Sequence, residues 1–149
     1  MKKEQIIKWT KYILDFMFFG GIAVTVTLPF TLKLIGRVIE HVAQHYAEVV
    51  IIYFVLGIAA VVIIRELRKM FATVIKGDCF VQDNVESLQK MGKWSFFIVV
   101  MSIVRSIVYL TIAMGVVILV FTIAGLFSFV LSFVFEDAVR FKEENDLTV

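Results

Sequence analysis

Three long apolar runs constrain this chain more than any other feature of its sequence. They cover residues 12–32, 49–64 and 94–135, and Arg105 is the only charged residue of the third run. A helix needs roughly 20 apolar residues to cross a bilayer core of roughly 30 Å, so the third run is long enough for two crossings. The sequence therefore predicts an all-α, polytopic membrane protein with four transmembrane helices in a single domain, residues 1–149.

Gly115 lies between the last two predicted crossings, where a tight turn would join them into a close hairpin. Pro29 is expected to kink the first helix or to begin its end. We expect the first helix to be retained rather than cleaved as a signal peptide, because Asp15 lies inside its front edge and no Ala-x-Ala site follows. The four crossings are expected at about residues 12–33, 47–65, 94–114 and 117–136.

The distribution of Lys and Arg predicts the orientation of these helices. Four of them precede the first run, six lie in residues 65–93 and two follow the last run, whereas only two lie in residues 33–48. Because short loops rich in Lys and Arg stay in the cytoplasm, this bias of 12 against 2 predicts that both termini and residues 66–93 are cytoplasmic. We interpret the basic residues as topology determinants beside the lipid bilayer, and expect no direct binding of nucleic acid.

Few side chains of this chain are suited to catalysis or metal binding. Cys79 is the single cysteine, which excludes an internal disulfide and a Cys-x-x-Cys redox pair. His41 and His45 are four residues apart in the predicted outer loop, where a helix would place them on one face, but two ligands do not make a zinc site. No glycine-rich phosphate loop or nucleophile elbow is present. We expect no enzyme activity, no metal and no cofactor.

The segment between the second and third runs has a helical pattern of its own. Apolar residues recur at helical spacing in residues 65–75, so the second helix is expected to continue to about residue 76. Gly77 is placed for a left-handed cap, and residues 83–86, Asp-Asn-Val-Glu, are typical of a capping box that opens the next helix. Residues 66–93 are therefore predicted to form a cytoplasmic helical hairpin that projects roughly 15 Å from the bilayer.

The hairpin and the tail, residues 137–149, are candidate surfaces for a protein partner. The hairpin has an aromatic residue at its tip and a basic face, whereas the tail extends the fourth helix and is acidic. An acidic tail beside a basic hairpin predicts either a contact between the two or a contact of both with a partner. The alternative for the apolar residues of the hairpin is that its two helices simply pack on each other. The candidate partner-binding residues are Arg65, Arg68, Lys69, Phe80 and Phe141.

Two stretches are distinctive, KMFATVIKGDCFVQDNVESLQKMGKW in the hairpin and LSFVFEDAVRFKEENDLTV at the end. They resemble the YoaS-like family of small bacterial membrane proteins of unknown function, with Cys79 in place of the family's usual proline. The resemblance implies a multi-pass protein of the bacterial cytoplasmic membrane that is often encoded beside a small helix-turn-helix repressor. It defines no catalytic residues. The matched signature positions are Gly77, Phe80, Asn84, Leu88 and Gly92.

Two classes of function are open to such a chain. The first is a regulatory membrane protein whose hairpin and tail bind a soluble partner, sequestering or controlling a helix-turn-helix transcription factor. The second is a small oligomeric transporter or channel, because four helices are typical of small multidrug exporters. Those exporters carry a carboxylate deep in the first helix, whereas Asp15 lies only three or four residues inside the predicted cytoplasmic edge. The sequence favours the regulatory class, and a homo-oligomer is compatible with both.

Arg105 is the one charge within the predicted crossings of the third run. It lies ten residues after Ser95, roughly 15 Å at helical rise, where a lipid-facing cation costs about 2.5–3.5 kcal/mol. Arg105, Ser102 and Tyr109 share a helical face and form a candidate intramembrane polar site for an anionic group. The alternative is that the guanidinium extends to an interface or that the third span is shifted outward. No carboxylate is at matching depth, so the expected partners are water, carbonyls and the hydroxyls of Thr25, Thr27, Thr122 and Ser128.

Overall fold

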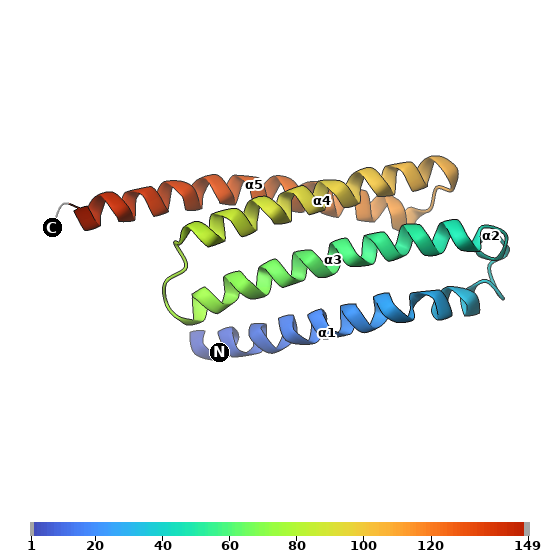
Figure 1. Ribbon diagram of the computed structural model, residues 1–149, viewed down its shortest axis with the longest axis horizontal. Coiled ribbons are helices and arrows are strands. Elements are labelled where there is room, and N and C mark those ends of the chain that lie inside the picture. Colours follow the sequence, from blue (N-terminus) through green and yellow to red (C-terminus); the bar gives the residue numbers. More distant parts are fainter. Residues whose placement is uncertain (1, 148–149) are drawn as a thin grey trace.

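The computed structural model describes residues 2–147, and these form four long helices and one short one (Figure 1). The short helix lies in the connection between the first two long ones. Each long helix is long and apolar enough to cross a membrane, as the sequence predicted. The helices are α1 Lys3–Ile35, α2 Glu40–Gln44, α3 Tyr46–Ile75, α4 Gln82–Val108 and α5 Ile112–Leu147.

The four long helices lie in one row rather than in a closed bundle. α1 packs on α3, α3 packs on α4 and α4 packs on α5, and no other pair of long helices is in contact within the described residues. Figure 1 shows the antiparallel neighbours of this row, with α5 partly behind α4. The α1/α3 pair and the α4/α5 pair are therefore joined along the seam between α3 and α4.

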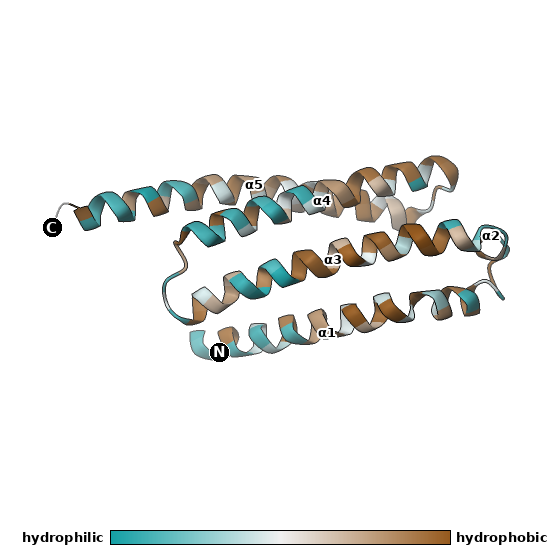
Figure 2. Cartoon of the chain, viewed as in Figure 1, coloured by the Kyte–Doolittle hydropathy of each residue, from teal (hydrophilic) through white to brown (hydrophobic). Residues whose placement is uncertain are grey.

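The two ends of the row differ in polarity. Figure 2 shows hydrophilic residues gathered at the end that holds the N-terminus, the α3–α4 turn and the C-terminus, and brown, hydrophobic helix surfaces farther along. We call this end the polar end, and we call the opposite end, with its short helix, the α2 end. The row can span a bilayer with the polar end outside the hydrocarbon.

The place of α4 inside the row explains its composition. Because α4 has a helix on both sides, eleven of its residues are buried, whereas two to five are buried in each other long helix. Several of these buried residues are serines, and α4 is the least apolar of the four long helices. Small polar side chains suit a helix that contacts other helices rather than lipid, because they let backbones approach closely.

The turn between α4 and α5 lies at residues 109–111 and not at Gly115, which is inside α5. Thr111 begins α5, because its hydroxyl accepts a hydrogen bond from the backbone N–H of Met114 at 3.2 Å. A threonine cap satisfies a free N–H group of the first helical turn. The expectation of a glycine turn was wrong because this turn needs no positive φ.

α1 runs through Pro29 to Ile35, so the proline does not end the helix. The hydroxyl of Tyr46 donates a hydrogen bond to the carbonyl of Pro29 at 2.7 Å. Tyr46 is the first residue of α3, so this bond ties the start of α3 to α1 at the α2 end.

The helical extensions predicted at the α3–α4 hairpin are present, since α3 continues to Ile75 and α4 begins at Gln82. Gly77 has a φ of +81°, the only positive φ among the described residues, in agreement with the predicted left-handed cap. The capping box predicted at residues 83–86 is wrong. The N-cap of α4 is Val81, with no side-chain cap bond, so Asp83 lies inside the first turn of the helix rather than at its N-cap.

Helices α4 and α5 approach each other closely at Gly92. A Cβ atom at this position would lie 2.8 Å from the ring of Phe129 on α5, which is inside van der Waals contact. The Phe129 ring is itself stacked on Phe96, with centroids 5.8 Å apart, so it has little room to move.

We expect the substitution Gly92→Ala to destabilise the protein by about 1–3 kcal/mol, because overpacking forces the Phe129 ring from its place. Thermal unfolding in detergent micelles measures the effect. Gly20→Ala is the matched control, since a Cβ at Gly20 of α1 meets nothing within 4 Å. That change should be neutral or stabilise by up to about 1 kcal/mol. Equal melting temperatures of the two variants would contradict the close α4/α5 contact.

Candidate functional site

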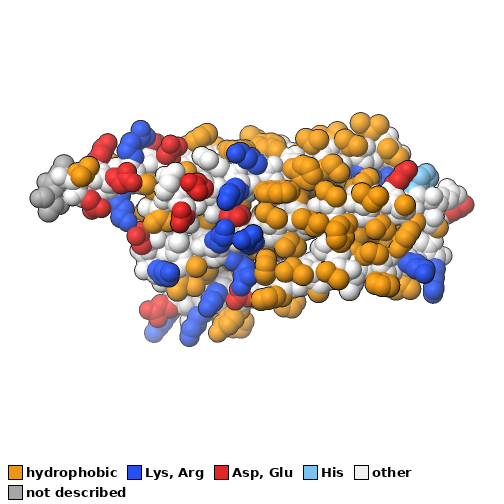
Figure 3. Space-filling view, viewed as in Figure 1, with side chains coloured by type: hydrophobic (Ala, Val, Ile, Leu, Met, Phe, Trp, Pro, Cys, Tyr) orange, Lys and Arg blue, Asp and Glu red, His pale blue; other side chains and the backbone are white. Residues whose placement is uncertain are grey.

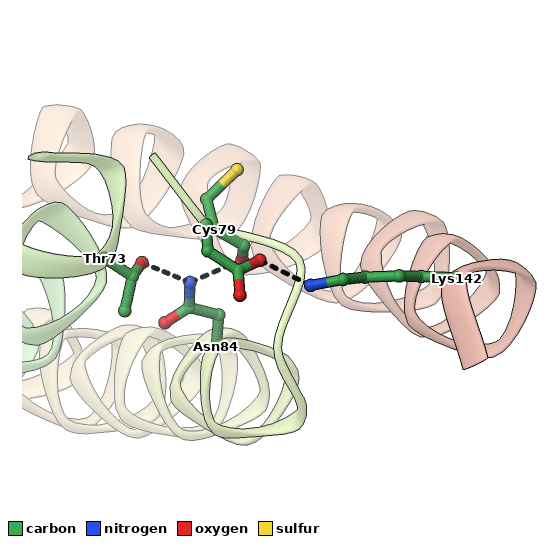
Figure 4. Close-up of polar contacts among 5 residues, drawn as sticks. Thr73, Cys79, Asn84 and Lys142 are labelled. Atoms are coloured by element: carbon green, nitrogen blue, oxygen red, sulfur yellow. Dashed lines mark hydrogen bonds and ion pairs between the residues drawn. The ribbon is translucent and has the colours of Figure 1, made fainter. Parts of the chain in front are cut away.

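The α3–α4 turn is held together by one buried side chain. The amide nitrogen of Asn84 donates to the hydroxyl of Thr73 at 2.7 Å and to the carbonyl of Cys79 at 2.6 Å. Figure 4 shows Asn84 reaching from α4 into the turn between these two acceptors. Asn84 is 2% exposed, and an unmet polar group in such a place costs about 1–3 kcal/mol. The turn is therefore a defined structure rather than a loose linker.

The tail of α5 contacts this turn. The Phe80 ring packs edge-on against Phe135, with centroids 5.2 Å apart, and Lys142 Nζ donates to Asp78 Oδ1 at 2.7 Å (Figure 4). The hydrogen bond with Asp78 raises the pKa of Lys142 above its ordinary value. The tail therefore contacts the hairpin, but the charges are the reverse of those predicted, because the tail supplies the cation and the hairpin supplies the carboxylate. Both charged groups are largely exposed, so the pair is weak and sensitive to salt.

Beyond this contact the tail projects away from the rest of the row. Val139 is the last buried residue of α5, and residues 140–147 are all exposed. Phe141 is 70% exposed there, between Arg140 and Lys142. The last two residues of the predicted tail, Thr148 and Val149, lie outside the described residues.

An open groove of about 550 Å³ lies between α1 and α3 at the polar end. We call it the basic groove, because five cations and a single carboxylate line it together with apolar side chains such as Phe18 and Phe71. Figure 3 shows Lys and Arg side chains as a band across this face of the molecule, where the hydrophobic surface begins. The five cations are Lys11, Arg65, Arg68, Lys69 and Lys76.

Two of the five cations of the basic groove are paired with carboxylates of the protein itself. Arg68 Nε donates to Asp15 Oδ1 at 2.8 Å, and its guanidinium lies 4.5 Å from the centroid of the Phe18 ring, so Arg68 holds α1 against α3. Lys69 lies 3.6 Å from Glu66. The remaining three cations have no acidic partner among residues 2–147 and are free to meet a ligand: Lys11, Arg65 and Lys76.

The structure divides the five predicted partner-binding residues into two groups. Arg65, Arg68 and Lys69 line the basic groove. Phe80 and Phe141 lie with α5, and Phe80, 44% exposed, is already engaged with Phe135. The sequence did not indicate that α1 supplies the second wall of the groove, because that contact joins helices from distant parts of the chain.

Glu66 is a buried carboxylate that the sequence analysis did not single out. It is 4% exposed and accepts a hydrogen bond from the hydroxyl of Ser87 on α4 at 2.8 Å. This bond crosses the seam between α3 and α4 near the polar end. Glu66 stands in a charged stretch that is typical of a solvated helix face, so only the packing of α4 shows that it is buried.

At the α2 end, Arg105 contacts a residue that was not among its expected partners. Arg105 lies in the last turn of α4 and donates from Nη2 to Nε2 of His41 on α2 at 3.1 Å. The His41 ring stacks on Tyr109, with centroids 3.9 Å apart, and on His45 at 4.7 Å. We call His41, His45, Arg105 and Tyr109 the α2 cluster. It brings together two of the three residues predicted for the polar site, Arg105 and Tyr109.

The expected hydroxyl partners of Arg105 are engaged elsewhere or do not reach it. Thr25, Thr27 and Thr122 each donate to a backbone carbonyl four residues earlier in their own helix, and Ser128 is buried on α5 without a recorded bond to Arg105. That prediction was wrong because the third helix ends at Val108 rather than near residue 114. The shorter helix brings Arg105 to the α2 end, within reach of His41.

Two buried polar side-chain atoms lack a hydrogen-bond partner among the described residues, and they belong to Ser102 and Arg105. These are the Ser102 hydroxyl and Arg105 Nε, on residues that are 0% and 6% exposed. The guanidinium therefore depends on few protein contacts, and the bond to His41 is the one hydrogen bond found for it within residues 2–147. No group of three or more His, Cys, Asp or Glu side chains in the same residues is arranged to hold a metal ion.

The pKa of His41 is lowered from its ordinary value of 6.5. Removal of the ring from water is the largest cause, followed by the positive charges of His45 and Arg105, while Glu48 acts in the opposite direction. His41 lies in α2, outside the membrane-spanning helices. Its neutral form is the one that fits the α2 cluster.

Nearly the whole chain matches one protein family. Residues 7–149 match the family described as "Protein of unknown function (DUF2975)". The chain belongs to this family. No curated protein and no solved structure matches it.

The five residues that carried the family resemblance in the sequence all build the hairpin and its packing. Leu88 is buried in the row, and the other four have the contacts described above. These five positions therefore contribute to the construction of the polar end, and none of them is an unpaired cation of the basic groove. The five residues are Gly77, Phe80, Asn84, Leu88 and Gly92.

We expect Asn84→Ala to loosen the hairpin turn, because the carbonyl of Cys79 and the hydroxyl of Thr73 lose their common donor. The free energy of unfolding should fall by about 1–3 kcal/mol. The thiol of Cys79 should react faster with a maleimide in purified protein. Glu86→Ala is the control, since Glu86 is exposed on the same helical turn. If Cys79 reacts at the wild-type rate in both variants, Asn84 does not hold the turn.

Proposed function

We propose that this protein is a regulatory protein of the bacterial cytoplasmic membrane that binds a cytoplasmic protein in its basic groove. The groove is the observation that carries the proposal. It combines three unpaired cations with apolar side chains on an end of the molecule that is rich in charge. A surface of this kind is complementary to an acidic segment with apolar anchors, such as an amphipathic helix.

The proposed orientation places the polar end in the cytoplasm. Twelve of the 15 Lys and Arg residues belong to sequence segments at this end, and two, Lys33 and Arg37, lie at the α2 end. Helices α3, α4 and α5 all continue past their apolar parts there, so a folded structure stands beyond the bilayer surface. Lysine and arginine resist transfer across the membrane, which favours this orientation.

The resemblance to the YoaS-like family supports a helix-turn-helix repressor as the partner. Binding such a repressor would hold it at the membrane, away from DNA, without any contact between this protein and nucleic acid. The projecting tail offers a second contact, because Phe141 is an aromatic residue with no packing role in the described structure and stands in water at the polar end. The tail and the groove would then engage different parts of one partner.

The alternative of a small transporter has less support. Its best candidate for an ion- or substrate-coupling carboxylate in the first helix is Asp15, and this side chain accepts the hydrogen bond of Arg68. A carboxylate that pairs an arginine between two packed helices is engaged in the fold. The regulatory function therefore remains our proposal.

The groove is tested by removing its three unpaired cations together. The triple variant Lys11→Gln/Arg65→Gln/Lys76→Gln leaves the Arg68–Asp15 and Lys69–Glu66 contacts in place. We expect recovery of the partner from lysate of the source bacterium to fall at least about tenfold, because each exposed charge contact contributes up to about 1 kcal/mol. Tagged protein in native membranes serves as bait, and mass spectrometry measures each captured protein.

The matched control is Lys8→Gln/Lys90→Gln/Lys93→Gln, which removes the same number of cations from exposed positions outside the groove. This control should retain the partner. A helix-turn-helix protein lost with the groove variant alone supports the proposal. Equal recovery with wild type and both variants would contradict it.

The orientation has its own test. Cys79 should be protected from a membrane-impermeant thiol reagent in intact cells and should react after the membrane is opened, because the hairpin tip is proposed to be cytoplasmic. A cysteine in place of Ala43, in a Cys79→Ser background, should react in intact cells, since Ala43 is exposed at the α2 end. The reverse pattern of labelling would overturn the proposed orientation.

A further inference from the structure

The hydrogen bond between Arg105 and His41 determines the protonation state of the histidine. A guanidinium has only donors, so Nε2 of His41 must be the acceptor at 3.1 Å and carries no proton. The ring is therefore neutral, with its proton on Nδ1. A protonated His41 has a donor on both nitrogens and would face Arg105 with an N–H and a positive charge.

The surroundings of His41 offer little compensation for a second charge. Arg105 faces it from α4, Tyr109 stacks on it from the turn after α4, and His45 stacks on it from the end of α2. From α3, Glu48 is the one acidic group that favours protonation. Glu40 of α2 accepts a hydrogen bond from Gln44, and Lys33 and Arg37 near the end of α1 line a neighbouring pocket beside Ala43 and Tyr46.

We propose that the α2 cluster is a proton-binding site that works as a latch, in which protonation of His41 releases α2 from α4. A proton from solvent binds to Nε2, the Arg105 Nη2–H···Nε2 hydrogen bond breaks, and no other bond changes. Two cations then stand within contact distance, and α2 moves away. This inference is independent of the proposed partner-binding function.

The direction of the pH dependence follows from the lowered pKa of His41. The docked state binds the proton less well than the released state, in which the histidine titrates near its ordinary value of 6.5. Docking is therefore fully stabilised above that pH and weakens as the pH falls below it.

The latch connects the two halves of the row. Helix α2 joins α1 to α3, whereas Arg105 and Tyr109 belong to the α4/α5 pair. The Glu66–Ser87 bond crosses the same seam near the polar end. Release of α2 removes the polar contact at the α2 end, while the packing of α3 on α4 and the Glu66–Ser87 bond remain, so the α1/α3 pair gains freedom relative to α4 at the α2 end.

Distance measurements between spin labels test the latch directly. Labels are placed on cysteines at Ala43 and Ile112, which are both exposed, in a Cys79→Ser background reconstituted in lipid nanodiscs. Both faces of a nanodisc meet the buffer, so the result does not depend on orientation. We expect one narrow distance distribution at pH 8 and a second, longer component at pH 5.

Three variants identify the group that binds the proton. His41→Gln keeps an acceptor for Arg105 but does not titrate, so its distribution should stay narrow at both pH values. His41→Lys carries a permanent charge and should show the longer component at pH 8. His45→Gln should keep the pH response of the wild type. A wild-type distribution that is the same at pH 8 and pH 5, or a His41→Gln variant that responds like wild type, would overturn the proposal.

An NMR titration gives a second test, because it measures the protonation of His41 directly and does not require α2 to move. In the His45→Gln variant the remaining histidine signal belongs to His41, and its midpoint should lie below 6.5 in wild-type surroundings and rise when Arg105→Met removes the neighbouring charge. A His41 titration midpoint that is at or above 6.5 and is unchanged by Arg105→Met would show that the two side chains do not interact.

Discussion

The contact between α3 and α4 is the interaction on which the rest of this structure depends. All three contacts between long helices join neighbours in the chain, and the seam is the middle one, so it joins the α1/α3 pair to the α4/α5 pair in one row. In a bilayer the hydrophobic effect does little to hold helices together, so close packing and polar contacts must do so. The buried Glu66–Ser87 bond and the serines of α4 supply both.

The row arrangement gives the two ends of the molecule different properties. At the polar end the α1/α3 pair opens into the basic groove, and the α4/α5 pair carries the tip and the tail. At the α2 end the short helix between α1 and α3 contacts the buried Arg105 of α4 through the His41 side chain. A change in the seam at either end would therefore change how the α1/α3 pair packs against the α4/α5 pair. Through this packing, partner binding in the basic groove and protonation of His41 would influence one another.

The residues on which the resemblance to the YoaS-like family rested have identifiable structural roles. Gly77 supplies the positive φ of the turn, Asn84 supplies its buried donor, and Gly92 allows α5 to approach. Sequence reasoning predicted the first of these because a glycine after a helix is a local signal. It assigned Asn84 to a capping box, because a local pattern cannot show that a side chain will instead turn toward Thr73 on the preceding helix.

The helical class, the four apolar segments long enough to span a membrane and the continuation of two of them into a hairpin can all be predicted from the sequence. These features are local, because in lipid each helix must satisfy its own backbone and therefore needs only a sufficient apolar run. The tertiary structure alone decided the open row, the burial of Glu66, the α1 wall of the basic groove and the partner of Arg105. His41 and Arg105 are 64 residues apart in the chain, and their contact exists because α4 ends three residues after the arginine and α2 folds over that end. No spacing along the chain encodes such a contact, since it depends on how separate helices pack.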